Sequence, residues 1–183
     1  MSKVNVAVVV GSNRRDSINR KFAQALIKLG RDKFNATMLQ IDDLPLFNQD
    51  MEKEPTPSVV RFKSELEKAD GLLVVTPEHN RSVPAVLKNA IDWGSRPPGK
   101  NSWAGKPVAI AGTSGGAIST ALAQAHLRLM LGILRTQVMG GEVYLNFKPD
   151  LIDDNGDITD EKTRKFLQDF VDQFAVHVAR YVS

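Results

Sequence analysis

The chain has 183 residues and a formal net charge of +3 at pH 7, with 42% hydrophobic and 25% charged residues. These proportions are those of an ordinary globular protein, so we expect residues 1–183 to form one domain. The sequence has no cysteine, which excludes disulfides and thiolate metal sites, and its three scattered histidines argue against a histidine-rich metal site.

Charge and hydropathy patterns indicate which kinds of ligand, macromolecule or membrane the chain is expected to bind. Lys and Arg alternate with Asp and Glu instead of forming blocks, so we expect no nucleic-acid partner, and the mild positive charge favours a small anionic ligand. No run of about 18 apolar residues occurs, so we expect no membrane span. The N-terminal segment lacks the charged region and cleavage site of a signal peptide, which makes the cytoplasm the expected location.

Short runs rich in β-branched residues alternate with helical patterns along the chain. The predicted strands are residues 4–10, 36–41, 71–76, 107–112 and 136–145. The predicted helices are residues 18–31, 57–69, 84–94, 117–134 and 160–182. The chain therefore reads as a β-strand followed by a helix, repeated along its whole length.

The predicted strands are apolar throughout, without the alternation of a sheet that has one solvated face. Such strands are expected where helices cover both faces of a parallel sheet. We therefore predict an α/β fold: a flavodoxin-like three-layer sandwich around a five-stranded parallel sheet of order 2-1-3-4-5.

Polar residues collect in three of the predicted loops. In open α/β sheets, ligands bind beyond the carboxyl ends of the strands, where the strand order reverses. The loops after the first, third and fourth strands read GSNRRDSIN (11–19), TPEHNRSVP (76–84) and GTSGGA (112–117). We expect these loops to share one site.

The first loop has the residues of a phosphate site. It leads into a helix N-terminus, where free N–H groups favour an anion, and Ser12, Arg14, Ser17 and Asn19 add further donors. It contains neither a Walker A motif nor the glycine pattern of a dinucleotide fold. In the alternative interpretation, Ser17 or Asp16 caps the helix and the arginines are solvated.

The other two loops have different chemistry. Ser114, Gly115 and Gly116 would let the backbone approach a flat ligand, although a glycine-rich turn into the next helix is an equally good interpretation. In the second loop a polar cluster precedes Ser82, which is interpreted as a helix cap. The cluster consists of Pro77, Glu78, His79, Asn80 and Arg81.

These motifs together resemble those of one family. G-S-x-R-x-x-S-x-N after the first strand, T-P-E-H-N-x-S-x-P-x-x-L-K-N-A-I-D-W after the third, and a T-S-x-G turn after the fourth occur here in order. The pattern resembles the NADPH-dependent FMN reductases, flavodoxin-like flavoproteins that include chromate and quinone reductases. The resemblance covers nearly the whole chain.

The resemblance implies an enzyme that uses bound FMN to transfer hydride from NAD(P)H to a small-molecule acceptor such as flavin, quinone or chromate. It assigns the phosphate to Ser12, Arg14, Ser17 and Asn19, and the isoalloxazine ring to two other groups. These are Pro77, Glu78, His79 and Asn80 along the ring, and Ser114, Gly115 and Gly116 at its other edge. The flavin carries the chemistry, so no catalytic side chain is assigned.

Two positions depart from the family pattern. The family commonly has tyrosine where His79 stands, and Arg81 replaces what is often a second aromatic residue. These changes reduce the aromatic surface beside the ring, and Arg81 is a candidate contact for an anionic substrate. The alternative function is that of a flavodoxin-type FMN electron carrier that does not react with nicotinamide.

The helix predicted at 117–134 is apolar around most of its circumference. The residues alone allow either a deeply buried helix or a seam between copies of the chain. The resemblance implies a homo-oligomer, a dimer or a homotetramer, with this helix as the candidate interface and Arg128 and Glu142 as polar partners there.

Overall fold

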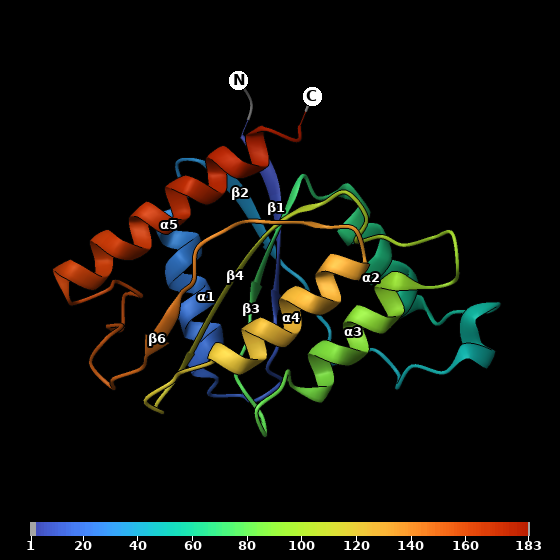
Figure 1. Cartoon of the computed structure of the whole chain (residues 1–183), viewed down its shortest axis with the longest axis horizontal. Coiled ribbons are helices and arrows are strands. Elements are labelled where there is room, and N and C mark those ends of the chain that lie inside the picture. Colours follow the sequence, from blue (N-terminus) through green and yellow to red (C-terminus); the bar gives the residue numbers. More distant parts are fainter. Residues whose placement is uncertain (1–2, 183) are drawn as a thin grey trace.

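The computed structural model describes residues 3–182 and has a parallel β-sheet between two layers of helices (Figure 1). The strands are β1 (Val4–Val10), β2 (Phe34–Met38), β3 (Gly71–Val75), β4 (Pro107–Ser114), β5 (Gln137–Val138) and β6 (Tyr144–Asn146). The helices are α1 (Ile18–Leu29), α2 (Pro57–Lys68), α3 (Ala85–Ser95), α4 (Ala121–Ile133) and α5 (Glu161–Ala179), with a short 3₁₀ helix at Gln49–Glu52. The strand order β2-β1-β3-β4-β5 and the parallel pairing confirm the predicted fold.

The prediction of a single last strand at 136–145 is wrong. Two short strands, β5 and β6, pair with different ends of β4 and are separated by a turn in which Gly141 has φ of 86°. The Arg128 guanidinium donates to the carbonyls of Met139 and Gly141 in this turn. A side chain from α4 thus takes the place of strand pairing, and the sheet has six strands.

The two sheet faces bury separate cores, and this explains the apolar strands. In β1, Val6, Val8 and Val10 face one core, whereas Ala7 and Val9 face the other. The first core is filled from α1 and α5, and the second from α2, α3 and α4. Burial of each large apolar side chain contributes roughly 1.5–3 kcal/mol, so both helix layers are held mainly by contact with the sheet.

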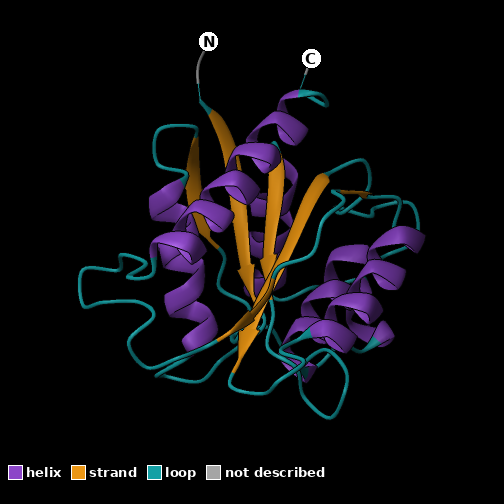
Figure 2. Cartoon of the chain, turned by 60° about the vertical axis from the view of Figure 1, so that its left-hand side comes forward, coloured by secondary structure: helices purple, strands orange, loops and turns teal. Residues whose placement is uncertain are grey.

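The loops after β1, β3 and β4 lie along one edge of the sheet, at the bottom of Figure 2, and the described chain ends lie at the opposite end. This is the arrangement that parallel strands impose, because all their carboxyl ends point the same way. No helix within residues 3–182 has the length and apolar character needed to cross a membrane.

Gly112 permits the close approach of two of these loops. A Cβ atom built on Gly112 would overlap the backbone carbonyl of Thr76 and the hydroxyl of Thr120, whereas one built on Gly116 would meet Ser114 Oγ at 3.5 Å. Overlap with backbone cannot be relieved by a side-chain rotation, so the β3 and β4 loops would have to separate.

We predict that Gly112→Ala lowers the free energy of unfolding by about 1–3 kcal/mol, the usual cost of overpacking. Gly116→Ala is the matched control and is expected to change stability by less than about 0.5 kcal/mol. Urea unfolding of both variants tests this. Equal midpoints would contradict the role given to Gly112.

Candidate functional site

Hydrogen bonds beyond the strand ends bring the three loops together. The N–H of Gly11 donates to the carbonyl of Val75 at 2.8 Å, and the N–H of Thr76 donates to the carbonyl of Ala111 at 3.0 Å. The β1, β3 and β4 loops are therefore bonded side by side at the carboxyl edge, where the sequence places a shared site.

The first loop ends in a capped helix N-terminus. Ser17 is the N-cap of α1, and its buried Oγ accepts from the N–H of Arg20 at 3.2 Å. Ser12 is half-buried at the end of β1, and Arg14 is exposed, with no ion pair to any residue among 3–182. Capping by Ser17 does not remove the anion site, because the first N–H groups of a helix have no intrahelical acceptor.

Asn19 holds α1 against β4. Its side-chain Nδ2 donates to the carbonyl of Thr113 at 2.9 Å, and its Oδ1 accepts from the N–H of Thr113 at 3.0 Å. The residue is buried, with 2% exposure. Both ends of the amide are used inside the protein, so the phosphate contact predicted for Asn19 would have to come from its backbone N–H.

The second loop contains a tight, strained turn. The backbones of His79 and Ser82 exchange hydrogen bonds of 3.0 and 2.9 Å, and the residues between them have positive φ, 49° for Asn80 and 64° for Arg81. This is the geometry of a type I′ turn, in which glycine usually occupies the position of Arg81. The turn leaves the side chains of His79, Asn80 and Arg81 exposed.

The interpretation of Ser82 as a helix cap is wrong. The N-cap of α3 is Pro84, which makes no side-chain cap bond, and the helix begins at Ala85. Ser82 Oγ instead lies 3.1 Å from His126 Nδ1 on α4. The type I′ turn places Ser82 in an extended position two residues too early to serve α3.

The carboxylate of Glu78 caps α4. Its Oε2 accepts from the N–H groups of Leu122 and Ala123 at 3.0 and 3.1 Å, and its Oε1 lies 3.3 Å from Nη1 of Arg81. The Glu78 side chain is 7% exposed, and α4 has no cap from its own Thr120. A negative charge at a helix N-terminus is favourable, so Glu78 ties the second loop to α4 and leaves its backbone for a ligand.

The third loop is exposed to solvent and is held by a hydrogen bond from β6. Ser114 Oγ accepts from the N–H of Gly116 at 3.2 Å, and the carbonyl of Gly116 accepts from Asn146 Nδ2 at 3.2 Å. Gly115 and Gly116 are exposed, and a Cβ atom on Gly115 would meet nothing within 4 Å. Asn146 is not predicted from the sequence, because the strand predicted at 136–145 ends one residue before it and no motif marks it.

The strand behind this loop also carries a tyrosine with a shifted pKa. Partial burial, followed by the hydrogen bond and negative charge of Glu142, raises the pKa of the Tyr144 phenol. A tyrosine phenol is protonated at neutral pH with or without this shift, and the hydroxyl of Tyr144 is hydrogen-bonded to Glu142. No cluster of metal-binding side chains is found in the described part of the chain.

We predict that Glu78→Ala lowers the free energy of unfolding by about 1–2 kcal/mol, because the α4 N–H groups and the Arg81 charge lose their acceptor. Glu78→Gln keeps one oxygen acceptor and is expected to lose about half as much. Thermal unfolding, with the exposed Glu54→Ala as control, measures both. A Glu78→Ala variant as stable as the control would refute the capping role.

Three comparisons place the chain among known proteins. The family model for NADPH-dependent FMN reductase matches residues 4–150. A 2-hydroxy-1,4-benzoquinone reductase from a Burkholderia species is 50% identical over 177 residues, which cover 96% of each chain. A quinone reductase from Pseudomonas putida is 49% identical over 178 residues, covering 96% of this chain and 95% of its own.

A solved structure shares the fold closely. The flavoenzyme NAD(P)H:(acceptor) oxidoreductase FerB from Paracoccus denitrificans superimposes with a TM-score of 0.94 at 45% identity, covering 97% of this chain and 98% of its own. This chain is therefore a member of the NADPH-dependent FMN reductase family, as its loop motifs predict.

Proposed function

We propose that this enzyme holds FMN across its three loops and uses NAD(P)H to reduce a small-molecule acceptor, in the first place a quinone. Membership of the family supports reductase chemistry with FMN and NAD(P)H. The observation that carries the proposal is the convergence of three loops rich in free backbone donors at the carboxyl ends of β1, β3 and β4 (Figure 2). We also propose that residues 1–183 act as one FMN-binding domain.

The first loop fits the phosphate end of FMN. The N-terminus of α1 offers unpaired N–H groups and a favourable dipole, and Arg14 adds a guanidinium that no carboxylate in residues 3–182 neutralises. A guanidinium binds phosphate through two parallel hydrogen bonds. Ser12 and Ser17 complete the proposed phosphate contacts.

The second and third loops fit the flat ring. FMN, when bound, supplies the hydride chemistry between nicotinamide and acceptor. Gly115 and Gly116 have no side chain to keep a planar group at a distance, and within residues 3–182 no backbone bond uses the N–H of Gly115. In the proposal this N–H group stabilises negative charge on the reduced ring, and residues 77–80 lie along the ring through their backbone.

A quinone is the proposed acceptor because close relatives are named quinone reductases. Flavin and chromate are further acceptors that the assay must include, and Arg81 is the proposed contact for an anionic one. Its charge is partly compensated by Glu78 at 3.3 Å, but the side chain is 66% exposed and so remains within reach of a ligand.

The test is to purify the FMN-loaded protein and follow NADPH and NADH oxidation with 1,4-benzoquinone, FMN and chromate in turn. Rapid oxidation with benzoquinone is expected. Bound flavin without oxidation of either nicotinamide would favour the alternative, an electron carrier. Absence of flavin binding would refute the whole assignment.

We predict that Arg14→Gln raises the Kd for FMN about 10- to 100-fold, since a charge-assisted hydrogen bond is worth about 1.5–3 kcal/mol. Lys21→Gln, which removes another exposed cation of the same segment, is the matched control. Quenching of flavin fluorescence measures both affinities. Equal effects of the two substitutions would show that the phosphate is bound elsewhere.

We further propose that α4 forms an interface between copies of the chain. The helix is not deeply buried: Leu129 is 74% exposed and Ile133 is 82% exposed. Leu122 continues the same apolar stripe on one side of the helix, and the exposed Ile118 lies in the turn just before α4. Arg128 is engaged with the β5–β6 turn, and Glu142 remains the proposed polar partner at this interface.

We predict that Leu129→Glu converts the oligomer to a monomer, because a buried unpaired charge opposes association. Leu46→Glu, which changes a loop residue that is 83% exposed, is expected to leave the oligomer intact. Light scattering after size-exclusion chromatography gives the masses, and distinguishes a dimer from a tetramer. A monomeric wild-type protein would contradict the interface.

A further inference from the structure

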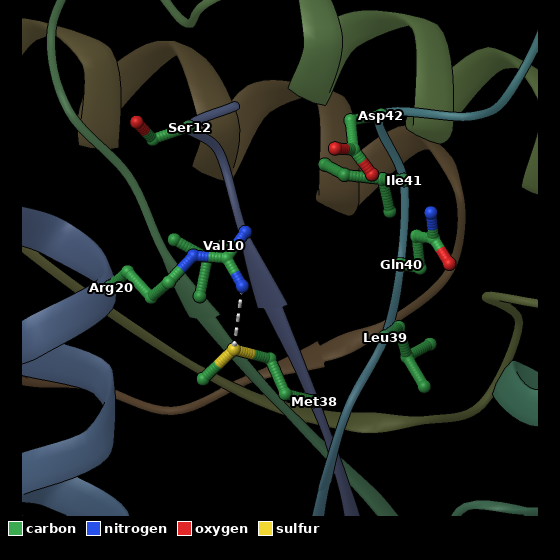
Figure 3. A pocket seen from close by; sticks show the side chains of 8 residues that line it. All are labelled: Val10, Ser12, Arg20, Met38, Leu39, Gln40, Ile41 and Asp42. Carbon is green, nitrogen blue, oxygen red and sulfur yellow. Dashed lines mark hydrogen bonds between the residues drawn. The ribbon is translucent and has the colours of Figure 1, made fainter. Parts of the chain in front are cut away.

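A pocket lies beside the proposed phosphate loop, residues 11–19. It has a volume of about 280 Å³ and opens between the carboxyl ends of β1 and β2, where Val10 and Ser12 are among its lining residues (Figure 3). Ser12 belongs both to this pocket and to the first loop. The pocket is therefore continuous with the proposed FMN site, on the side away from β3 and β4.

One wall of the pocket carries an uncompensated cation. Arg20 of α1 extends its guanidinium into the pocket, where Nη1 lies 3.7 Å from the thioether Sδ of Met38, the last residue of β2 (Figure 3). Thioether sulfur is a weak acceptor, and no carboxylate of the described residues pairs with Arg20. The guanidinium is therefore free to bind phosphate.

The opposite wall carries a free carboxylate. Asp42 and Gln40 line it, and neither side chain has a hydrogen bond or ion pair within residues 3–182 (Figure 3). A carboxylate repels a simple anion but accepts hydrogen bonds from sugar hydroxyls. A guanidinium facing a carboxylate thus fits a ligand that combines a phosphate with a ribose.

The local charge exceeds what one phosphate requires. Residues 14–21 contain Arg14, Arg15, Arg20 and Lys21 but one acidic residue, Asp16. A phosphate monoester carries about two negative charges at neutral pH. After the FMN phosphate is counted, a net positive charge remains in this segment, and Arg20 is the one of its cations that lines the pocket.

We propose that this pocket binds the phosphorylated adenosine ribose of NADPH, with Arg20 on the 2′-phosphate and Asp42 on a ribose hydroxyl. The inference rests on the proposed function and extends it, because it assigns the choice between NADPH and NADH to two residues outside the family motifs. Arg20 favours NADPH through its charge. Asp42 opposes the 2′-phosphate and supports the unphosphorylated diol, so the two residues set the preference in opposite directions.

The test is calorimetric titration of the FMN-loaded protein with 2′,5′-ADP, with 5′-ADP and with inorganic phosphate. The wild type is expected to bind 2′,5′-ADP at least about tenfold more tightly than 5′-ADP, the worth of about 1.4 kcal/mol. Inorganic phosphate is expected to bind far more weakly than either. Equal affinity for 2′,5′-ADP and 5′-ADP, or phosphate binding as tight as that of 2′,5′-ADP, overturns the proposal.

Variants separate the two residues. Arg20→Gln is expected to abolish the preference for 2′,5′-ADP, and Asp42→Asn is expected to increase it. Arg31→Gln, two residues beyond the far end of α1, removes an equal charge from a residue paired with Asp32 and should leave the preference unchanged. The proposal is overturned if Arg20→Gln and Arg31→Gln behave alike, or if Asp42→Asn fails to raise the preference.

Steady-state kinetics give the corresponding change in the reaction. Arg20→Gln should raise the KM for NADPH about tenfold, with little change in the KM for NADH or in kcat. The nucleotide titrations require no turnover. A protein that binds 2′,5′-ADP as expected but oxidises neither nicotinamide would refute the proposed function separately from the pocket.

Discussion

A buried side-chain amide sets the geometry of the carboxyl edge of the sheet, where the three loops lie. Asn19, in the first turn of α1, makes two hydrogen bonds to the backbone of Thr113, which is 94 residues away at the end of β4. Because the amide is buried, leaving either bond unmade would cost about 1–3 kcal/mol. The N-terminus of α1 is thereby held over the sheet, next to the loops that follow β3 and β4. The phosphate end and the ring end of the proposed flavin site depend on this attachment.

In the proposed site, side chains position the backbone, and the backbone is the part that would contact the ligand. Glu78 caps α4, Asn19 fastens α1, and Asn146 holds the carbonyl of Gly116. Such a site suits a cofactor that performs the chemistry itself, since the protein then supplies position and fixed dipoles. The strain at Asn80 and Arg81 belongs to the same arrangement, because positive φ at both residues turns the second loop back toward α3.

The two flanks of the site differ in character. Toward β2, the edge is polar and basic, with free charges on Arg20 and Asp42. Toward α4, it meets an exposed apolar stripe that includes Leu129 and Ile133. We therefore propose phosphorylated ligands on one flank and apolar contact with another copy of the chain on the other. Both proposals follow from which helix packs beside which strand, and they are compatible with one enzyme whose proposed ring site lies between the two flanks.

The sequence alone determined the fold class, the strand order and the identity of the three loops, because continuous apolar strands and local motifs depend on neighbouring residues. It did not determine what individual side chains do. Glu78 and Asn19 were predicted as ligand contacts, yet their partners lie 44 to 94 residues away, and only folding brings those backbone groups within reach. The splitting of the last strand and the pocket between Arg20 and Asp42 also arise from tertiary contacts between distant segments. Local patterns are set by the chain itself, whereas the direction and partner of each polar side chain are decided by the packing of elements that the sequence keeps far apart.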